Sequence, residues 1–396
     1  MENASVLLCR FGELFLKSGN RQRFERVLAD NIRAAVAGLP EARVESTHGR
    51  VLVRVRPADA DDAANRLARV FGLVSFSIAR KVAVDADLEA MGQAAVEATQ
   101  SAIAARDPGA ATLTFKVESR RADKRFAVTS LEMSRRIGAR VQAETGLPVD
   151  VHTPALTIGV EVSANGAFVY AGTRASPGGL PVGVAGRALL LLSGGIDSPV
   201  AGWLAAKRGL ALDAIYFHSP PYVGEKSRDK VLELGRKLAR WQALRSVTVV
   251  PFTETQKRLR EAGPGELAVV LYRRMMMRIA DAIADRLESS ALVTGENLGQ
   301  VASQTVENLA TIEAAARHLV LRPLLTYDKV ETTALARRIG TYETSILPFD
   351  DCCSLFVPAH PATRARVEDA AKAEAKLDIA AEITATVAAS EHVPIA

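Results

Sequence analysis

The sequence predicts an α/β protein whose C-terminal half is a doubly wound parallel sheet and whose N-terminal half consists of smaller α+β units. After residue 187, apolar strands alternate with helix-like stretches. These strands are almost continuously apolar, which is typical of a parallel sheet covered on both faces. The segment "RASPGGLPVGVAGR" (174–187) separates the halves, because its four glycines and two prolines make it the clearest linker-like stretch.

The N-terminal half is predicted to contain two α+β units. The first, 1–60, and the second, 61–165, both combine short strands with helices, and a linker is expected over 166–187. The expected elements of the first unit are a strand over Ala4–Arg10, a helix over Arg21–Val36, and short strands around Val44 and over Val51–Val55. The second unit alternates the strands "TLTFKVES" and "TIGVEVS" with helices over Asp61–Phe71, Leu88–Ala105 and Leu131–Thr145.

Residues 188–396 are predicted to form one doubly wound domain, whose ligands should lie at the carboxyl ends of its strands. A buried strand over Ala188–Leu192 is followed by a helix over Val200–Arg208. "ALDAIYFHS", "SVTVVPF" and "ALVTGEN" are the next predicted strands, with a helix over Asp229–Ala243 between the first two. The last 30 residues are Ala-rich and predicted to be helical.

Composition narrows the class of protein. A net charge of +5 permits nucleic acid as a partner without demanding it. Three cysteines are too few for a disulfide scaffold, and no Cys/His cluster has zinc-site spacing, so no metal site is expected from these residues. No apolar segment approaches the roughly 20 residues that span a bilayer. Because the N-terminus is also unlike a signal peptide, a cytoplasmic protein is expected.

The first strand of the doubly wound half ends in "SGGIDS", Ser193–Ser198. Gly194 and Gly195 are expected to allow backbone angles and close approach that a Cβ would forbid. The following helix would direct its N–H groups at an anion, Ser193 and Ser198 would add hydroxyl donors, and Asp197 could hold Mg²⁺. The alternative is an ordinary strand-to-helix turn capped by Asp or Ser. A Walker-type lysine is missing from the turn.

This turn resembles the pyrophosphate-binding loop of the PP-loop ATP pyrophosphatases, S-G-G-x-D-S, whose fold is of the adenine nucleotide alpha hydrolase type. Five other stretches agree with it in order: "RFGELFLKSGNRQRFE", "FKVESRRADKRFAVTSLEMSRRIG", "GGLPVG", "RRMMMRIA" and "TGENLGQVASQT". Together the six resemble the tRNA 4-thiouridine synthetase (tRNA sulfurtransferase) family. The resemblance implies an N-terminal ferredoxin-like domain, a tRNA-binding THUMP domain and a PP-loop domain.

The family resemblance also implies an activity. ATP and Mg²⁺ would serve to adenylate uridine-8 of tRNA, with release of pyrophosphate; sulfur would then replace AMP and give 4-thiouridine. The expected partners are tRNA and a cysteine desulfurase that supplies persulfide, and a homodimer is compatible with tRNA reaching a distant site. The expected form lacks a C-terminal rhodanese domain, which leaves open where sulfur enters and weakens any role in thiamine biosynthesis.

The resemblance places nucleotide contacts on further residues of the PP-loop domain. Backbone groups of Leu191 and Leu192 would bind adenine or ribose, and Tyr216 and Phe217 would wall the base. Arg273 would pair with phosphate charge, since a guanidinium matches that geometry. Gly295 would permit close backbone approach, and Gln304 offers both a donor and an acceptor. The alternatives are a core aromatic strand and a partly buried helix with a basic edge.

A basic stretch in the second unit is the candidate tRNA contact. Phe115 and Phe126 flank five cations, and such clustering suits phosphate contacts, although a solvated charged loop is the alternative. The cations are Lys116, Arg120, Arg121, Lys124 and Arg125.

Cys352 and Cys353 lie between Pro348 and Pro358 in a predicted loop, where functional residues concentrate. From the residues alone, an inert packing role for the two cysteines is as well supported as a functional one. The resemblance implies that one cysteine of this loop is catalytic, and Cys353 fits its register better. Cys352 is a candidate for resolving a disulfide, although a bond between adjacent cysteines is a strained ring. Cys9 is expected in the core.

The neighbours of the cysteine pair, Asp350 and Asp351, oppose thiolate formation. The candidates for compensating cations are Lys329, Arg322 and Arg364. Two other classes of function stay open: a PP-loop ligase for a small molecule, and a tRNA-binding protein with a regulatory nucleotide site.

Overall fold

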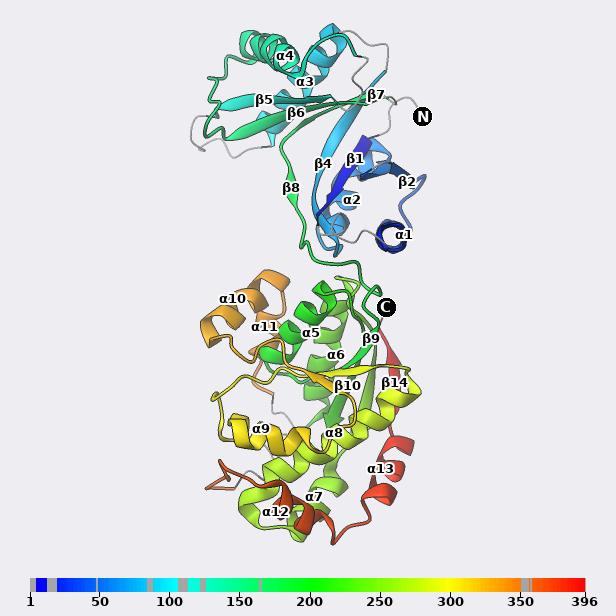
Figure 1. Cartoon of the computed structure of the whole chain (residues 1–396), viewed down its shortest axis with the longest axis vertical. Coiled ribbons are helices and arrows are strands. Elements are labelled where there is room, and N and C mark those ends of the chain that lie inside the picture. The colour runs from blue at the N-terminus through cyan, green and yellow to red at the C-terminus, as the bar shows by residue number, and fades with distance from the viewer. Residues whose placement is uncertain are drawn as a thin grey trace. The chain divides into compact units, whose positions relative to one another are not determined.

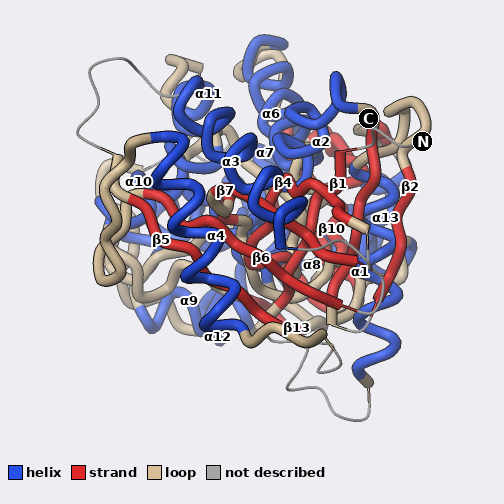
Figure 2. The backbone as a smooth tube through the Cα atoms, turned by 90° about the horizontal axis from the view of Figure 1, so that it is seen from above, coloured by secondary structure: helices blue, strands red, loops and turns tan. Residues whose placement is uncertain are grey.

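The computed structural model describes residues 5–12, 20–47, 49–83, 88–105, 113–121, 126–163, 166–349, 356 and 358–395. The chain forms two compact units, Met1–Gly179 and Leu180–Ala396 (Figure 1). Strands and helices are coloured separately in Figure 2. Within the described part of the chain, no helix combines the length and the apolar character that crossing a bilayer requires.

The first unit is built on one eight-stranded sheet with the order β2-β3-β1-β4-β7-β6-β5, with β8 paired to β4. The pair β5–β6 is parallel, and the other pairs are antiparallel. The strands are β1 (Ser5–Phe11), β2 (Arg43–Thr47), β3 (Arg50–Val55), β4 (Leu73–Val82), β5 (Phe115–Arg121), β6 (Leu156–Ser163), β7 (Gly166–Ala171) and β8 (Arg174–Ala175).

The helices of the first unit bury apolar stripes. In α1, Leu28 and Ile32 lie one turn apart and are both fully buried. Helix α4 begins where the Thr129 hydroxyl accepts a hydrogen bond from the Glu132 N–H, and it ends at Gly146 with φ 68°. The helices are α1 (Arg21–Ala35), α2 (Ala60–Leu67), α3 (Leu88–Ala104) and α4 (Ser130–Thr145), with a 3₁₀ turn η2 (Pro57–Asp59).

The first unit extends further along the chain than the predicted linker allows. Strand β7 pairs with β6 and β4, and β8 pairs with β4, so residues 166–175 belong to the sheet. The start of the predicted linker at residue 166 is therefore wrong. The reason is that β7 is a six-residue strand that comes shortly before the glycine- and proline-rich stretch 174–187, so its own pattern is too short to separate it from that stretch.

The second unit has a six-stranded sheet with the order β13-β12-β9-β10-β11-β14. Its first five strands are parallel, as predicted, and β14 pairs antiparallel with β11. The Ala-rich C-terminal segment is thus helical only in part. The strands are β9 (Arg187–Leu191), β10 (Ala211–His218), β11 (Leu244–Pro251), β12 (Ala291–Val293), β13 (Leu319–Leu321) and β14 (Glu391–Pro394).

Strand β9 lies between β10 and β12, so the chain builds the sheet outward from β9 in both directions. This is the topological switch point of a doubly wound sheet, where a crevice opens at the carboxyl ends of the strands. The helical elements are α5 (Asp197–Lys207), α6 (Glu225–Ala239), α7 (Thr253–Ala262), η3 (Gly265–Leu267), α8 (Ala268–Arg286), η4 (Ala302–Gln304), α9 (Val306–Glu313), α10 (Lys329–Ile339), α11 (Tyr342–Ser345), α12 (Val367–Glu374) and α13 (Ile379–Ala388).

Helix α8 carries much of the core of the second unit, since most of its residues are buried. A charged cluster inside this core joins α8 to α12: the Glu374 carboxylate accepts from Arg274 at 2.7 and 2.9 Å and from Arg278 at the same distances. Burial raises the pKa of the Glu374 carboxyl, but the two guanidinium groups outweigh it and hold this pKa below its usual range. The cluster thereby joins to α12 the part of α8 that directly follows Arg273.

Candidate functional site

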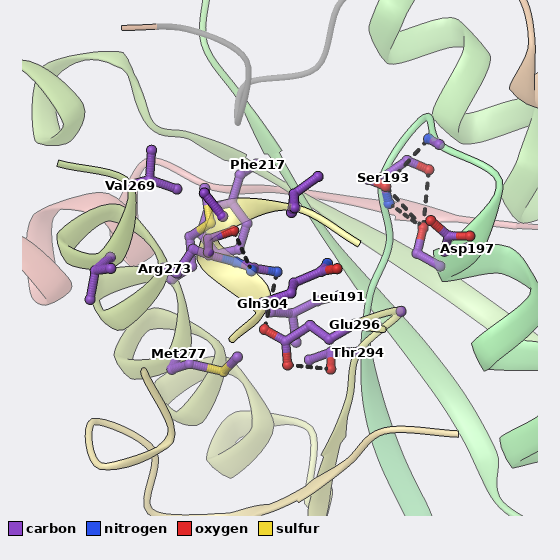
Figure 3. Close-up of a pocket in the computed structure, with 18 of the residues that line it drawn as sticks. Leu191, Ser193, Asp197, Phe217, Val269, Arg273, Met277, Thr294, Glu296 and Gln304 are labelled. Atoms are coloured by element: carbon purple, nitrogen blue, oxygen red, sulfur yellow. Dashed lines mark hydrogen bonds and ion pairs between the residues drawn. The ribbon is translucent and has the colours of Figure 1, made fainter. Parts of the chain in front are cut away.

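The turn between β9 and α5 is preformed by its two serines. The Ser198 hydroxyl accepts from the Ser193 N–H at 2.8 Å and donates to the Ser193 carbonyl at 3.3 Å. The Ser193 hydroxyl accepts from the Gly195 N–H at 3.3 Å. Because the two side chains satisfy backbone groups of the turn, its shape does not depend on a bound ligand. Figure 3 shows Ser193 and Asp197 together on one side of the pocket, with Arg273 across from them.

The glycines act differently from the prediction. Neither Gly194 nor Gly195 has a positive φ, and a Cβ on Gly195 would meet the Ser193 hydroxyl at an ordinary 3.5 Å. The predicted need for glycine-only backbone angles is therefore wrong at this turn. The tight position is Gly295, where a Cβ would lie 2.6 Å from the Ser198 nitrogen and 2.8 Å from its Cα. Gly295 thus lets the chain after β12 lie directly against the first turn of α5.

A pocket of about 600 Å³ opens at the switch point. Its walls come from the carboxyl ends of β9, β10 and β12, from α8, and from the η4 turn, so segments far apart in sequence meet there. Its size lies within the usual range for ligand sites. Eleven of the twelve predicted nucleotide positions line it, and Gly194 is the exception: Leu191, Leu192, Ser193, Gly195, Asp197, Ser198, Tyr216, Phe217, Arg273, Gly295 and Gln304.

Part of the pocket wall is apolar and rigidly backed. Phe217 packs edge-on against Phe252 at a centroid distance of 5.1 Å, and Tyr216 stacks on His218 at 5.8 Å. Val270 and Met277 of α8 face the same cavity. Tyr216 and Phe217 are thus both core residues and pocket walls, which combines the two readings that the sequence left open.

Arg273 is held over the pocket by an ion-pair network that the sequence did not predict. Its guanidinium contacts Glu296 at 3.0 Å and donates to the Ser303 hydroxyl at 3.1 Å. Glu296 is 1% exposed and also accepts from Arg322 Nε at 2.6 Å. Burial raises the pKa of Glu296, but the Arg273 and Arg322 charges outweigh it and keep this pKa below its usual range. Glu296 therefore stays ionised and orients Arg273.

Gln304 presents an unsatisfied acceptor to the pocket. The residue is 9% exposed, and its side-chain carbonyl oxygen accepts no hydrogen bond from any residue that the structure describes. Its backbone is fixed, since its N–H donates to the Val301 carbonyl and its carbonyl accepts from the Gly299 N–H. A buried acceptor without a partner costs free energy, so this oxygen is suited to a donor on a ligand.

Lys329 supplies the cation that the turn itself lacks. Its ammonium group lies 2.7 and 2.9 Å from the two carboxylate oxygens of Asp197. Gln300 also donates to Asp197, at 3.1 Å. Lys329 is the first residue of α10, which begins at an Asp328–Glu331 capping box. The capping pattern marks the start of this helix in the sequence, but no pattern there indicates that its first lysine reaches a loop 132 residues earlier.

The structure describes neither cysteine of the predicted pair and only part of the predicted RNA-binding stretch. Cys352, Cys353, Lys124 and Arg125 lie outside the described residues. Two candidate partners of the cysteine loop are engaged elsewhere, because Lys329 pairs with Asp197 and Arg322 with Glu296.

Cys9 is a core residue, as predicted. It is fully buried, and burial raises the pKa of its thiol to about 12. Such a thiol is protonated at neutral pH and unreactive.

The described cations of the basic stretch lie on strand β5 and do not share one face. Lys116 and Arg120 are four residues apart and point to the same side, since side chains alternate along a strand. Arg121 points to the other side, where it donates to the Phe126 carbonyl at 2.7 Å. Lys116 pairs with Glu118 at 3.2 Å, and Arg120 is exposed. Phe115 is fully buried and so unavailable for stacking on a base.

Comparison with known proteins gives matches to three families along the chain. Residues 6–77 match the ThiI ferredoxin-like domain, residues 85–171 the THUMP domain, and residues 183–379 the thiamine biosynthesis protein (ThiI). The chain is 48% identical to a probable tRNA sulfurtransferase of Moorella thermoacetica over 95% of both chains. It is 43% identical to that of Brevibacillus brevis over 98% of this chain and 96% of the relative.

Among solved structures, the chain is similar to a 4-thiouridine synthetase that was crystallised with RNA and bound ATP. The TM-score is 0.90 at 35% identity, over 99% of this chain and all of the other. A second similar structure is PH1313 from Pyrococcus horikoshii, with a TM-score of 0.66 at 25% identity, over 85% of this chain and 99% of the other.

Proposed function

Because this chain belongs to the tRNA sulfurtransferase family, we propose that it converts uridine-8 of tRNA to 4-thiouridine at the expense of ATP. The observation that carries the proposal is the pocket at the switch point of the second unit. There the serine-braced turn, Lys329 and Arg273 gather hydrogen-bond donors and positive charge beside an apolar cavity of about 600 Å³. This combination suits a nucleotide whose base is buried and whose phosphates face the turn.

In the proposed complex, the adenine of ATP lies against the apolar wall of Phe217 and Met277. The free acceptor oxygen of Gln304 takes a hydrogen bond from the exocyclic amine of the base. The phosphates extend toward Ser193–Ser198 and the first turn of α5. Asp197 would hold Mg²⁺ through the lone pair that its contacts with Lys329 and Gln300 leave open. This ion is usually bound by one or two carboxylates together with phosphate oxygens. Bound there, the ion would supply further neutralisation of phosphate charge.

The first chemical step is adenylation of the uridine. The uridine O4 attacks the α-phosphorus, the bond to the β-phosphate breaks, and pyrophosphate leaves into the turn. Arg273 and Lys329 are fixed in advance by Glu296 and Asp197, so their charges meet the developing negative charge without reorganisation. The target uridine must leave its stack to reach this site.

The second step brings in sulfur. The terminal sulfur of a persulfide attacks C4 of the adenylated uridine, and AMP leaves. We assign Cys353 to this step, as carrier of the persulfide or as the thiol that cleaves the remaining S–S bond. Cleavage by a thiol leaves a disulfide, which an external thiol reductant must reduce. A cysteine desulfurase is the proposed persulfide source, and Cys352 is the candidate second thiol.

The first unit is the proposed tRNA grip. Exposed Arg120, together with Lys116, Lys124 and Arg125, would contact phosphates and give salt-dependent affinity. A homodimer would let a tRNA held by one copy reach the pocket of the other. Since tRNA is the substrate, we place the protein in the cytoplasm.

The test is reconstitution with unmodified tRNA, ATP and a persulfide-loaded desulfurase, with thiouridine and pyrophosphate measured together. We expect both products, in equal amounts and dependent on tRNA. Pyrophosphate release that does not depend on tRNA would favour a small-molecule ligase. If no pyrophosphate is released, a tRNA-binding protein is favoured. Cys353→Ser should abolish thiolation but keep pyrophosphate release, and Cys352→Ser is its matched control. If the two variants exchange behaviours, the assignment of Cys353 is wrong.

A further inference from the structure

Aromatic and cationic side chains form a surface cluster, which we name the platform: Tyr222 and Arg260 are exposed, and Phe356 and Lys257 are half-buried. The rings of Tyr222 and Phe356 meet edge-to-face, with centroids 5.2 Å apart. The Lys257 ammonium lies 5.7 Å from the Tyr222 centroid, and the Arg260 guanidinium 5.2 Å from the Phe356 centroid. Each ring is thus paired with one cation of α7, within the range of cation–π attraction.

The chain that carries Tyr222 is held firmly at the carboxyl end of β10. The buried Ser219 hydroxyl donates to Gln256 of α7 at 2.5 Å, and the Thr253 hydroxyl donates to the Pro220 carbonyl at 2.6 Å. The Val223 N–H donates to the Ser219 carbonyl at 2.9 Å. Tyr222 nevertheless remains 49% exposed. A rigidly supported aromatic ring that stays half exposed is not explained by packing of the core.

Both aromatic residues of the platform lie a few residues along the chain from residues that line the pocket. Tyr222 follows the pocket-lining Tyr216 and Phe217 on the same segment. On the other side, Phe356 is followed by Pro361 and Ala362, which line the pocket, and the Ala362 N–H donates to the carbonyl of Glu266, another lining residue. Phe356 also packs against the apolar core that contains the pocket-lining residues Phe217 and Val270.

The charge of the platform favours a polyanion over a protein surface. Arg260 is exposed and forms no ion pair with any residue in the described part of the chain. Lys257 forms an ion pair with Glu254 at 2.8 Å, and the carboxylates of Glu254 and Glu261, both on α7, act on its charge. An exposed aromatic ring next to cations is the combination that binds unpaired nucleotides, because bases stack on the ring and phosphates contact the cations.

We propose that the platform binds one unpaired nucleotide of the tRNA at the entrance to the pocket, with its base stacked on Tyr222 and its phosphate facing Arg260 and Lys257. The inference rests on the proposed function and adds to it the residues that receive the extruded part of the substrate. Contacts in the first unit would hold the body of the tRNA, so the platform should affect catalysis more than overall affinity.

The first test compares Tyr222→Ala and Tyr222→Phe at saturating tRNA. Stacking of a base requires an aromatic ring, which Phe keeps and Ala lacks. Tyr222→Ala should therefore lower the thiolation rate about tenfold or more, while the rate of Tyr222→Phe stays within about twofold of wild type. The tRNA dissociation constant and the ATP affinity should stay within about twofold. Arg260→Ala should lower the thiolation rate in the same direction as Tyr222→Ala. Its matched control is Lys372→Ala, because the Lys372 side chain on α12 is 80% exposed and lies over no aromatic ring of the described residues.

The second test does not depend on activity. Tyr222→Trp places a fluorescent ring on the platform, and addition of unmodified tRNA should quench it through stacking. Leu319→Trp is the control, since Leu319 is 64% exposed at the opposite, amino-terminal end of a parallel strand.

Three results would refute the proposed nucleotide site. They are an unchanged thiolation rate in Tyr222→Ala, equal quenching at positions 222 and 319, or a Tyr222→Ala rate that is lowered with desulfurase-delivered sulfur but not with sulfide. The last result would identify a protein-docking surface. If wild type makes no thiouridine and the platform tryptophan is still quenched, the proposed function fails and the platform stands.

Discussion

Replacement of Lys329 by methionine tests whether this lysine serves the phosphates of ATP or only the fold. Its ammonium lies 2.7 Å from Asp197, on the phosphate-facing turn. A charge about 4 Å from a phosphate oxygen contributes about 4 kcal/mol at an effective dielectric constant near 20. Because the side chain is 47% exposed, solvent screening reduces this, and we take about 2–3 kcal/mol. That energy corresponds to a loss of about 30- to 150-fold in pyrophosphate release.

The same substitution should scarcely change stability. A half-exposed ion pair contributes about 0–1 kcal/mol, so we expect the melting temperature to fall by no more than about 4 °C for a unit of this size. The matched control is Lys237→Met, which removes a lysine whose ammonium donates to the Gly340 carbonyl at the far end of the same helix α10. Its pyrophosphate release should be unchanged.

The assay is tRNA-dependent pyrophosphate release under single-turnover conditions, with thermal unfolding measured on the same samples. The reasoning is refuted if Lys329→Met releases pyrophosphate within about threefold of the rate of wild type, or if Lys237→Met loses as much activity. A large drop in melting temperature in Lys329→Met alone would mean that the Asp197 pair maintains the fold.

Three further predictions follow from the pocket. Gly295→Ala should lower stability by about 1–3 kcal/mol and abolish pyrophosphate release, because its Cβ would lie 2.6 Å from the Ser198 nitrogen. The comparison is Gly299→Ala, at a position with open space but φ 77°. Equal losses of activity in the two variants would contradict the steric reason. Gln304→Leu should raise the dissociation constant for ATP about tenfold, as expected for a lost hydrogen bond to a buried acceptor, with little change in melting temperature. Calorimetric titration with ATP checks this, and an unchanged dissociation constant would show that Gln304 does not contact the base. Glu296→Gln should destabilise the protein most at neutral pH: the pKa of Glu296 is lowered in the fold, so its contribution is present above the unfolded pKa of about 4.3 and is lost as the pH falls through the lower folded value. Denaturant unfolding from pH 7 to pH 3 should therefore show the difference between variant and wild type shrinking, and a constant difference would exclude the charge as its cause.

The sequence predicted the doubly wound half well because its strands are distinctive. Strands β9, β10 and β11 are buried on both faces, so their residues are almost all apolar and followed by recognisable helices. Strand β14, "EHVP", was not predicted because it is short, mostly exposed and lies at the sheet edge. Strand β4 was not predicted because two serines, an arginine and a lysine interrupt its apolar pattern.

The pocket could be predicted only where local sequence carries it. The turn Ser193–Ser198 is contiguous, and its shape follows from its own serines. Lys329 and Glu296 act through contacts with Asp197 and Arg273, which are distant in the chain, and local patterns do not encode such pairs. The basic stretch was predicted as one cluster, and it is not one for another reason. Side chains alternate along β5, so Arg120 and Arg121 point to opposite sides although they are adjacent in sequence.

Strand β4 limits how the N-terminal half can be dissected. The ferredoxin-like match ends at residue 77 and the THUMP match begins at residue 85, yet β4 runs over Leu73–Val82 and pairs with β1 on one side and with β7 on the other. A fragment cut between the two matches would divide this strand or leave one half with an open sheet edge that invites aggregation. For expression of the first unit, or for its fusion to another enzyme as the proposed tRNA grip, the sheet of residues 5–175 should be kept in one piece.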